Sequence, residues 1–158
     1  MSEPRAASVG DVSELVRVIN LAYRVEDFFI DGDRTNDGDV RRRMAMPDAG
    51  FLVVDDTDPG RLAAAVYMEI RGERGYFGML SVDPAVQRRG LGRALVSSVE
   101  DHCRAAGCRF LDIEVVNLRE ELPPFYSRLG FLPTGEAAFH DPHKLRRPAH
   151  LVVMTKTL

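Results

Sequence analysis

The apolar residues that follow position 11 recur at helical spacing. They are Val12, Leu15, Val16, Ile19, Ala22 and Tyr23. Ser8 and Asp11 resemble a capping box, so the pattern predicts a helix that begins after Ser8 and ends at about residue 23. Residues 24–39 show no period and are expected to be mostly loop. A short helix is expected over residues 39–46, before Pro47.

The middle of the chain shows strand patterns instead. Short apolar runs bounded by turn-prone residues predict strands over residues 51–54, 61–71 and 76–82. Residues 72–75, Gly-Glu-Arg-Gly, are typical of a hairpin turn between the last two of these strands.

The helical period returns at residue 91 and is followed by further short elements. One face of the predicted helix carries Leu91, Leu95, Val99, Cys103 and Ala106, and the helix is expected to end at Gly107. The remaining elements are expected to be a strand over residues 110–116, a helix over about 119–129 that Gly130 caps, and strands near 131–132 and 150–155. Because proline is tolerated only in the first turn of a helix, Pro123 and Pro124 indicate that the helix begins near residue 123.

The order of these elements is β-α-α-β-β-β-α-β-α-β-β, which combines hairpins with one strand-helix-strand crossover. It predicts an α/β (α+β) fold, in which a mixed, mostly antiparallel sheet of about six to seven strands is flanked by about four helices. A chain of 158 residues has the length of one domain, so residues 1–158 are expected to form a single domain.

Composition and charge narrow the classes of function. A formal net charge of -3 argues against general nucleic-acid binding. No apolar run approaches the length of a membrane span, and the N-terminus lacks the apolar stretch of a signal peptide. Cys103 and Cys108 are too few for a disulfide framework or a metal site, so free thiols and a cytoplasmic location are expected.

A loop rich in glycine and arginine separates the strand over residues 76–82 from the helix that begins at residue 91. Its candidate anion-binding residues are Gln87, Arg88, Arg89, Gly90, Leu91, Gly92 and Arg93. Backbone N–H groups at a helix start have no internal partner, and the helix dipole adds partial positive charge there. Glycines allow a phosphate to approach those amides closely, so the segment is expected to bind a pyrophosphate.

Other phosphate motifs fit this segment less well. A dinucleotide fingerprint requires a third glycine where the chain has Leu95, and a P-loop requires Gly-Lys-Ser/Thr, which is absent. The remaining alternative is an ordinary strand-to-helix turn with solubilising arginines.

The order Val82-Asp83-Pro84 followed by Gln87-x-x-Gly90-x-Gly92 resembles the signature of the GCN5-related N-acetyltransferase (GNAT) superfamily. A second segment, Tyr126-x-x-x-Gly130-Phe131, resembles the family's helix-end pattern. The motifs cover residues 80–131, whereas residues 1–50 match by pattern only. The resemblance implies acetyl-CoA as co-substrate, bound through its pyrophosphate. The histidines and cysteines are too irregularly placed for a metal site, so no metal is expected.

The resemblance also assigns roles to residues near the loop. A backbone amide among Leu80, Ser81 and Val82 would polarise the thioester carbonyl. Tyr126 would protonate the departing thiolate, with a core aromatic as the alternative. Glu114 would be the base, as in the ribosomal-protein and N-terminal amine acetyltransferases, or else a solvated strand carboxylate.

Several further positions depart from the family pattern or offer alternatives to it. Glu69 and Tyr76 are rivals to Glu114, and Tyr76 stands where the histone acetyltransferases carry a glutamate. Many relatives have an asparagine that contacts the cofactor where this chain has Arg119. Asn117 could take its place, or Arg119 could reach the cofactor itself.

The acceptor side is expected between two loops. The first carries six acidic residues against Arg24 and Arg34, which would either attract a cationic amine or form an ordinary solvated loop. It also carries Phe28 and Phe29, which would line the pocket together with Tyr76 or seal the core. The second, residues 140–148, is basic and could meet a cofactor phosphate or an acidic group of the acceptor, which weakens the case for a cationic substrate. The leading hypothesis is an N-acetyltransferase, monomer or homodimer, that acts on a small-molecule primary amine. The alternatives are a protein N-terminal or lysine acetyltransferase and a non-catalytic acyl-CoA sensor.

Overall fold

The computed structural model describes residues 3–158, and for Gln87, Arg88 and Arg89 it describes the backbone only. Seven strands form one sheet in the order β1-β2-β3-β4-β5-β7-β6. Within it β4 and β5 are parallel, and the other neighbouring strands are antiparallel. The strands are β1 (Arg5–Ala6), β2 (Ala49–Asp55), β3 (Leu62–Arg71), β4 (Arg74–Val82), β5 (Phe110–Val116), β6 (Leu132–Ala138) and β7 (His150–Thr157).

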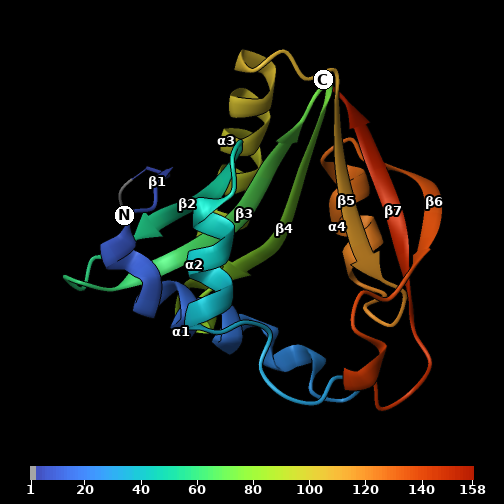
Figure 1. The fold of residues 1–158 in the computed structure, drawn as a ribbon, viewed down its shortest axis with the longest axis horizontal. Coiled ribbons are helices and arrows are strands. Elements are labelled where there is room, and N and C mark those ends of the chain that lie inside the picture. Colours follow the sequence, from blue (N-terminus) through green and yellow to red (C-terminus); the bar gives the residue numbers. More distant parts are fainter. Residues whose placement is uncertain (1–2) are drawn as a thin grey trace.

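Four α-helices of the described chain cover the two faces of this sheet (Figure 1). They are α1 (Val12–Tyr23), α2 (Asp37–Ala45), α3 (Leu91–Ala105) and α4 (Leu122–Arg128). Helices α1 and α2 share a hydrophobic cluster with one face, and α3 and α4 share a cluster with the other. Among residues 3–158, no helix has both the length and the apolar character needed to cross a membrane.

Strand β2 shows why an unbroken apolar run forms a strand here. Phe51 and Val53 pack against the α1 and α2 cluster, whereas Leu52 and Val54 pack against the α3 and α4 cluster. Successive side chains of a strand point to opposite faces, so a strand covered on both faces needs apolar residues at every position.

The structure confirms the predicted fold class and element order, with differences at the boundaries. Helix α4 begins at Leu122, so its two prolines lie in the first turn. Strand β6 extends to Ala138, well past the expected residue 132. Most of its side chains are exposed, and Pro133 lies on this edge strand, so no alternating apolar pattern marked its length.

Candidate active site

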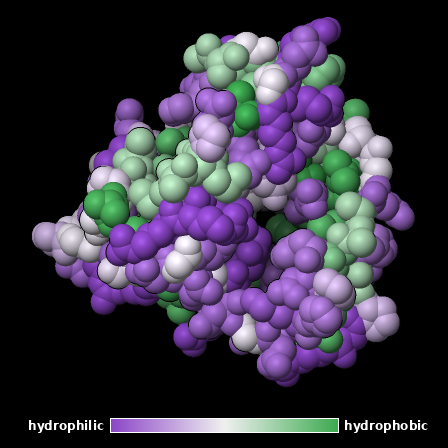
Figure 2. All heavy atoms as spheres, viewed as in Figure 1, coloured by the Kyte–Doolittle hydropathy of each residue, from purple (hydrophilic) through white to green (hydrophobic). Residues whose placement is uncertain are grey.

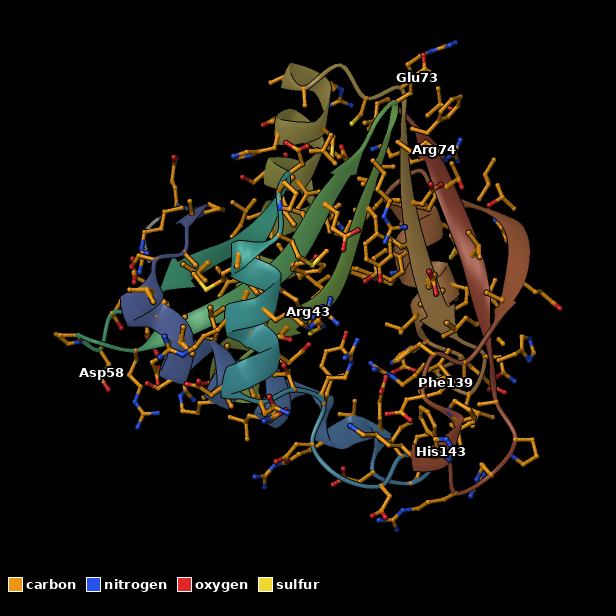
Figure 3. All side chains as sticks on the ribbon, in the orientation of Figure 1. Arg43, Asp58, Glu73, Arg74, Phe139 and His143 are labelled. Carbon is orange, nitrogen blue, oxygen red and sulfur yellow. The ribbon has the colours of Figure 1, made fainter. Side chains whose placement is uncertain are left out.

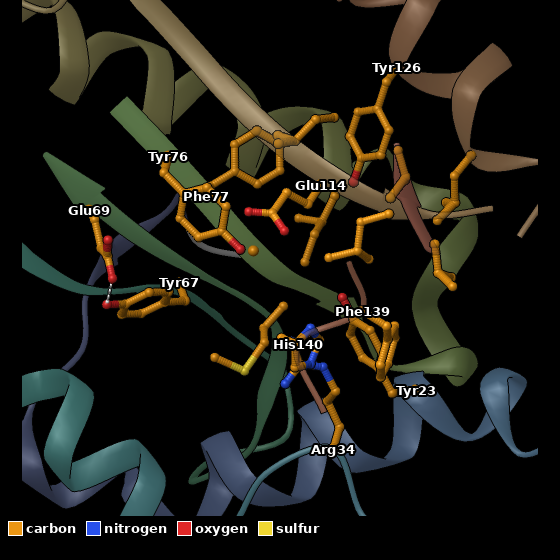
Figure 4. Close-up of a pocket in the computed structure, with 18 of the residues that line it drawn as sticks. Tyr23, Arg34, Tyr67, Glu69, Tyr76, Phe77, Glu114, Tyr126, Phe139 and His140 are labelled. Carbon is orange, nitrogen blue, oxygen red and sulfur yellow. Dashed lines mark hydrogen bonds between the residues drawn. The ribbon is translucent and has the colours of Figure 1, made fainter. Parts of the chain in front are cut away.

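Strands β4 and β5 separate after a short parallel ladder. The ladder pairs Arg74–Tyr76 with Phe110–Asp112, and Arg74 donates two hydrogen bonds of 2.7 and 2.8 Å to Asp112 at this joined end (Figure 3). Beyond it the strands diverge, and a cavity of about 260 Å³ lies in the gap (Figure 4). We call this space the reaction cavity. In the view of Figure 1, the surface of the molecule is hollowed near its centre, and the surface around the hollow is mostly hydrophilic (Figure 2).

A bulge in β4 lies at the edge of the reaction cavity. Tyr67 pairs with Gly78 and Ala65 pairs with Ser81, so Met79 and Leu80 together oppose a single residue of β3. Met79 has a φ of 52°, and its carbonyl accepts a hydrogen bond of 2.8 Å from the Ser81 hydroxyl. A bulge re-aims the residues beside it. Leu80, which has no partner in the β3 register, therefore lines the gap.

Tyr126 projects from α4 and is 6% exposed. Its ring packs against Phe77, Phe125 and Phe131, with ring centroids 5.0 to 6.0 Å apart. Burial raises the pKa of Tyr126 above its ordinary value, so the phenol stays protonated at neutral pH.

A second cavity, of about 400 Å³, lies beside α4, and we call it the donor cavity. Its lining includes Arg119, Phe125 and Arg128. The residues common to the donor cavity and the reaction cavity are Tyr23, Leu80, Leu122 and Tyr126. Tyr126 and Leu80 therefore stand where the two spaces meet.

The loop that precedes α3 presents helix-start amides beside the end of β4. Asp83 accepts a hydrogen bond from the backbone N–H of Ala85 and forms an ion pair of 3.1 Å with Arg17. These two contacts fix the start of the loop. A 3-10 helix, Pro84–Arg89, then leads to Gly90, whose φ of 69° favours glycine. A Cβ added to Gly92 would lie 3.9 Å from Leu80 Cδ2, so a side chain there would fill the space between helix and strand.

The backbone amides at the start of α3 fit an anionic ligand, although not every residue predicted to bind it can do so through its side chain. Leu91 is 7% exposed and belongs to the core, so it can contribute only its backbone. Arg93 is exposed on the first turn. The side chains of Gln87, Arg88 and Arg89, which were expected to contact phosphate, lie outside the described part of the structure.

Asn117 and Arg119 are occupied by other parts of the protein. The Asn117 side-chain oxygen accepts a hydrogen bond of 2.8 Å from the backbone N–H of His150, which ties the end of β5 to β7. Arg119 forms ion pairs with Glu26 at 3.0 Å and with Glu121 at 2.8 Å. Arg119 lines the donor cavity and Asn117 does not, so of the two only Arg119 is placed to meet a ligand.

Glu114 projects from β5 into the reaction cavity (Figure 4). Its side chain is exposed. Burial raises the pKa of Tyr76, and the negative charge of Glu114 raises it further. The rival carboxylate, Glu69, also lines the cavity but accepts hydrogen bonds from the Tyr67 hydroxyl and from Arg71. Glu114 makes no ion pair with a described residue and is therefore the freer of the two to accept a proton.

Arg34 and His140, which the sequence indicated only as members of the two charged loops, both line the reaction cavity. Arg34 stacks over the Tyr23 ring, with its guanidinium carbon 5.3 Å from the ring centroid. His140 stacks on Phe139, and burial, followed by the charge of Arg34, lowers its pKa, so the imidazole is neutral at pH 7. Both lie on loops with no period. Only the composition of the two loops could have indicated them.

The two acceptor loops are joined to each other, and we call this contact the clasp. The two loops lie side by side, and Ile30 forms a backbone bridge with Leu145 there (Figure 1). Arg146 also forms an ion pair of 3.1 Å with Asp31. Lys144 also donates to the backbone carbonyl of Asp33. Four of the six acidic residues expected to attract a cation form ion pairs with arginines of the same protein, so most of the predicted negative rim is neutralised; they are Glu26, Asp31, Asp37 and Asp39.

The structure places Phe28 and Phe29 outside the reaction cavity. Phe29 is fully buried beside Ile30, Val116 and Leu151, and it fastens the clasp to the end of β5. Phe28 is 49% exposed and packs edge-on against Phe29. Of the three predicted acceptor-binding residues, only Tyr76 lines the cavity. No group of three His, Cys, Asp or Glu side chains able to hold a metal occurs within the described residues.

Comparisons with known proteins agree with this arrangement. Residues 17–131 match the model of the Acetyltransferase (GNAT) family. The chain is 32% identical to the mycothiol acetyltransferase of Propionibacterium freudenreichii subsp. shermanii over 116 residues, which is 69% of this chain and 37% of that protein. It is 36% identical to glucosamine 6-phosphate N-acetyltransferase 1 of Oryza sativa subsp. japonica over 88 residues, 51% of this chain and 52% of that protein.

A solved structure shows the same fold over nearly the whole chain. The ribosomal-protein-S18-alanine N-acetyltransferase from Escherichia coli superposes with a TM-score of 0.79 at 18% identity, covering 99% of this chain and 94% of that one. The chain spans about half or less of the curated relatives named above. The family model nevertheless covers most of the chain, and its residues 80–131 surround the gap between β4 and β5. The protein belongs to the GNAT family of acetyltransferases.

Proposed function

We propose that the protein is an N-acetyltransferase that moves the acetyl group of acetyl-CoA to the primary amine of a small molecule. Both substrates would be bound at once, the donor in the donor cavity and the acceptor in the reaction cavity. The observation that carries this proposal is the position of Tyr126. Its buried, protonated hydroxyl belongs to a side chain that lines both cavities, where a thioester and an amine would meet.

Acetyl-CoA would be held by the backbone amides at the start of α3 and by Arg119 in the donor cavity. When bound, it supplies the acetyl group as a thioester. The bulge directs Leu80 toward the gap, and its backbone N–H is our candidate to stabilise the negative charge that develops on the carbonyl oxygen.

Two proton transfers remain for side chains. An amine with a pKa near 10.4 is protonated at pH 7, and freeing it costs about 4.6 kcal/mol. Glu114 would accept this proton, directly or through water. Tyr126 would donate its proton to the sulfur as the carbon–sulfur bond breaks, and the second proton that the nitrogen loses on becoming an amide would restore the phenol.

The clasp and the relatives both favour a small acceptor over a protein. A protein segment would need an open-ended groove, whereas the Ile30–Leu145 bridge joins the two loops that bring Arg34 and His140 to the reaction cavity. The curated relatives are named for mycothiol and for glucosamine 6-phosphate.

The Tyr126→Phe variant tests the proposal. We expect thiol release from acetyl-CoA in the presence of an amine acceptor to fall by about 100-fold or more, while calorimetry shows acetyl-CoA affinity within about threefold of wild type. Because burial raises the pKa of Tyr126, its protonated form persists to alkaline pH, so the loss should be constant between pH 6 and 9.

The two possible failures have different meanings. Unchanged turnover in Tyr126→Phe would remove this residue as the acid but keep the enzyme. If wild-type protein does not bind acetyl-CoA, or binds it without acetylating any amine of a broad panel, the proposed function is wrong.

A further inference from the structure

Most charged side chains of the reaction cavity are neutralised within the protein. Glu69 pairs with Arg71 at 2.7 Å, Arg43 with Asp39 at 3.1 Å and Glu26 with Arg119 at 3.0 Å. Two charges differ from these. Among the described residues, neither Glu114 nor Arg34 has an ion-pair partner.

Arg34 is fixed where it lies. Its guanidinium is half-buried, stacks over the Tyr23 ring and lines both the reaction cavity and an outer groove of about 470 Å³ between the two acceptor loops. Burial lowers the pKa of His140, and the positive charge of Arg34 lowers it further. Burial also raises the pKa of Tyr76, and the charge of Arg34 opposes that rise. The carboxylate on which this charge acts, Glu26, is already paired with Arg119, so the Arg34 guanidinium can take a further anion to replace its lost hydration.

Arg34 and Glu114 stand on opposite sides of the same space. Glu114 projects from β5 near Tyr126, whereas Arg34 enters from the loop before α2, beside His140 (Figure 4). The reaction cavity is therefore dipolar, with a free negative charge near the site of chemistry and a free positive charge at the far end.

We propose that the acceptor is a zwitterion: an amine that also carries a carboxylate or phosphate, with the amine toward Glu114 and the anionic group on Arg34. This inference rests on the proposed function and names its substrate class. A guanidinium presents two parallel N–H donors that match either anion. His140, neutral and adjacent, can add one hydrogen bond to the same group. A diamine would instead place its second positive charge against Arg34.

Matched acceptors test the proposal directly. In the carboxylate arm, 4-aminobutanoate is compared with butylamine, and in the phosphate arm, O-phosphoethanolamine is compared with ethanolamine. Each compound is assayed for turnover with acetyl-CoA and, separately, for binding to the protein in the presence of CoA. In at least one arm, we expect the anionic member to be favoured in kcat/KM and in affinity by about 10- to 100-fold.

Variants identify the residue responsible. In Arg34→Gln the preference should fall to within about threefold, mainly through KM, and Arg34→Lys should retain part of it because it keeps the charge. Arg24→Gln, on the same loop but exposed and outside both cavities, should behave like wild type. Thermal unfolding of each variant shows that the comparison is made on folded protein.

The outcomes separate this inference from the function on which it rests. Equal or better use of the neutral amines in both arms, or a preference that survives Arg34→Gln, overturns the zwitterion proposal while acetyl transfer stands. A preference in binding that Arg34→Gln abolishes, without turnover on any compound, supports the anion subsite and overturns the proposed function.

Discussion

Tyr126 and Glu114 face the same cavity from environments that differ in burial. Tyr126 is buried among three phenylalanines, whereas Glu114 is exposed to the cavity. Burial keeps a phenol protonated, which suits an acid, and exposure lets a carboxylate pass its proton to water, which suits a base. The two proposed proton transfers thus depend on which strand and helix each residue occupies.

The first prediction concerns Glu114. Replacing it in Glu114→Gln removes the proton acceptor but keeps the size of the side chain, so we expect kcat/KM to fall by about 100-fold or more. An acceptor amine whose pKa is close to 7 is already largely unprotonated and should lose much less. Steady-state kinetics with amines of graded basicity measure this difference. The same loss for every amine would show that Glu114 does not act as a base.

The chemistry at single residues could be predicted from sequence only where a motif fixed it. Tyr126 and the loop at Gly90 and Gly92 were identified because their spacing follows a local strand or helix. Arg34 and His140 were not, because they are more than a hundred positions apart and meet only through the clasp. Phe29 was expected either to line the pocket or to seal the core, because a sequence cannot tell a buried loop residue from a binding one.

At the scale of elements, β4 shapes the site, because it is joined to β5 at one end and bulged at the other. The residue inserted at the bulge reverses the face of the sheet to which the following side chains point. Phe77, before it, packs with the α3 and α4 cluster, whereas Met79 packs with the α1 and α2 cluster. Regular alternation would put both on one face. The strand was predicted from its apolar residues, but the bulge was not, since one extra residue leaves no distinct pattern.

The joined end of β4 gives the second prediction. A Cβ added to Gly75 would lie 2.4 Å from the sulfur of buried Cys103 and 3.3 Å from Leu111 Cδ1. We expect Gly75→Ala to lower the free energy of unfolding by about 1–3 kcal/mol, because α3 must shift away from the sheet.

Denaturant unfolding measures this change, and Gly135→Ala is the matched control. Gly135 lies in β6 with nothing within 4 Å of its added Cβ, so its variant should be as stable as wild type or slightly more stable. Equal effects of the two substitutions would mean that α3 does not pack on β4 as closely as described.

At the scale of the whole molecule, the sheet consists of two halves that are joined at both ends of the gap between β4 and β5. The parallel ladder joins them at one end, and the clasp joins them at the other (Figure 1). The crossover through α3 and the mixed sheet were predictable from the order of elements. The clasp was not, because it depends on two long loops whose contacts lie between distant parts of the chain.

The clasp gives the third prediction, which compares two adjacent phenylalanines. Phe29→Ala should destabilise the protein by about 3–5 kcal/mol and raise the KM for the acceptor, because buried Phe29 anchors the clasp. Phe28→Ala should change stability by about 0.5 kcal/mol or less. Acetyl-CoA affinity, measured on folded protein below the unfolding transition, should be unaffected in both. An acceptor KM that is equal in the two variants would argue against the clasp as a wall of the site.

Because the gap is closed at both ends, the polypeptide forms a ring around the place where donor and acceptor would meet. A synthetic conjugate of CoA and acceptor would have to pass one of its ends through this ring in order to bind. The width of the opening, and not only the fit of the two halves of the conjugate, would then decide which conjugates inhibit. A conjugate with bulky groups at both ends would enter only while the clasp was open.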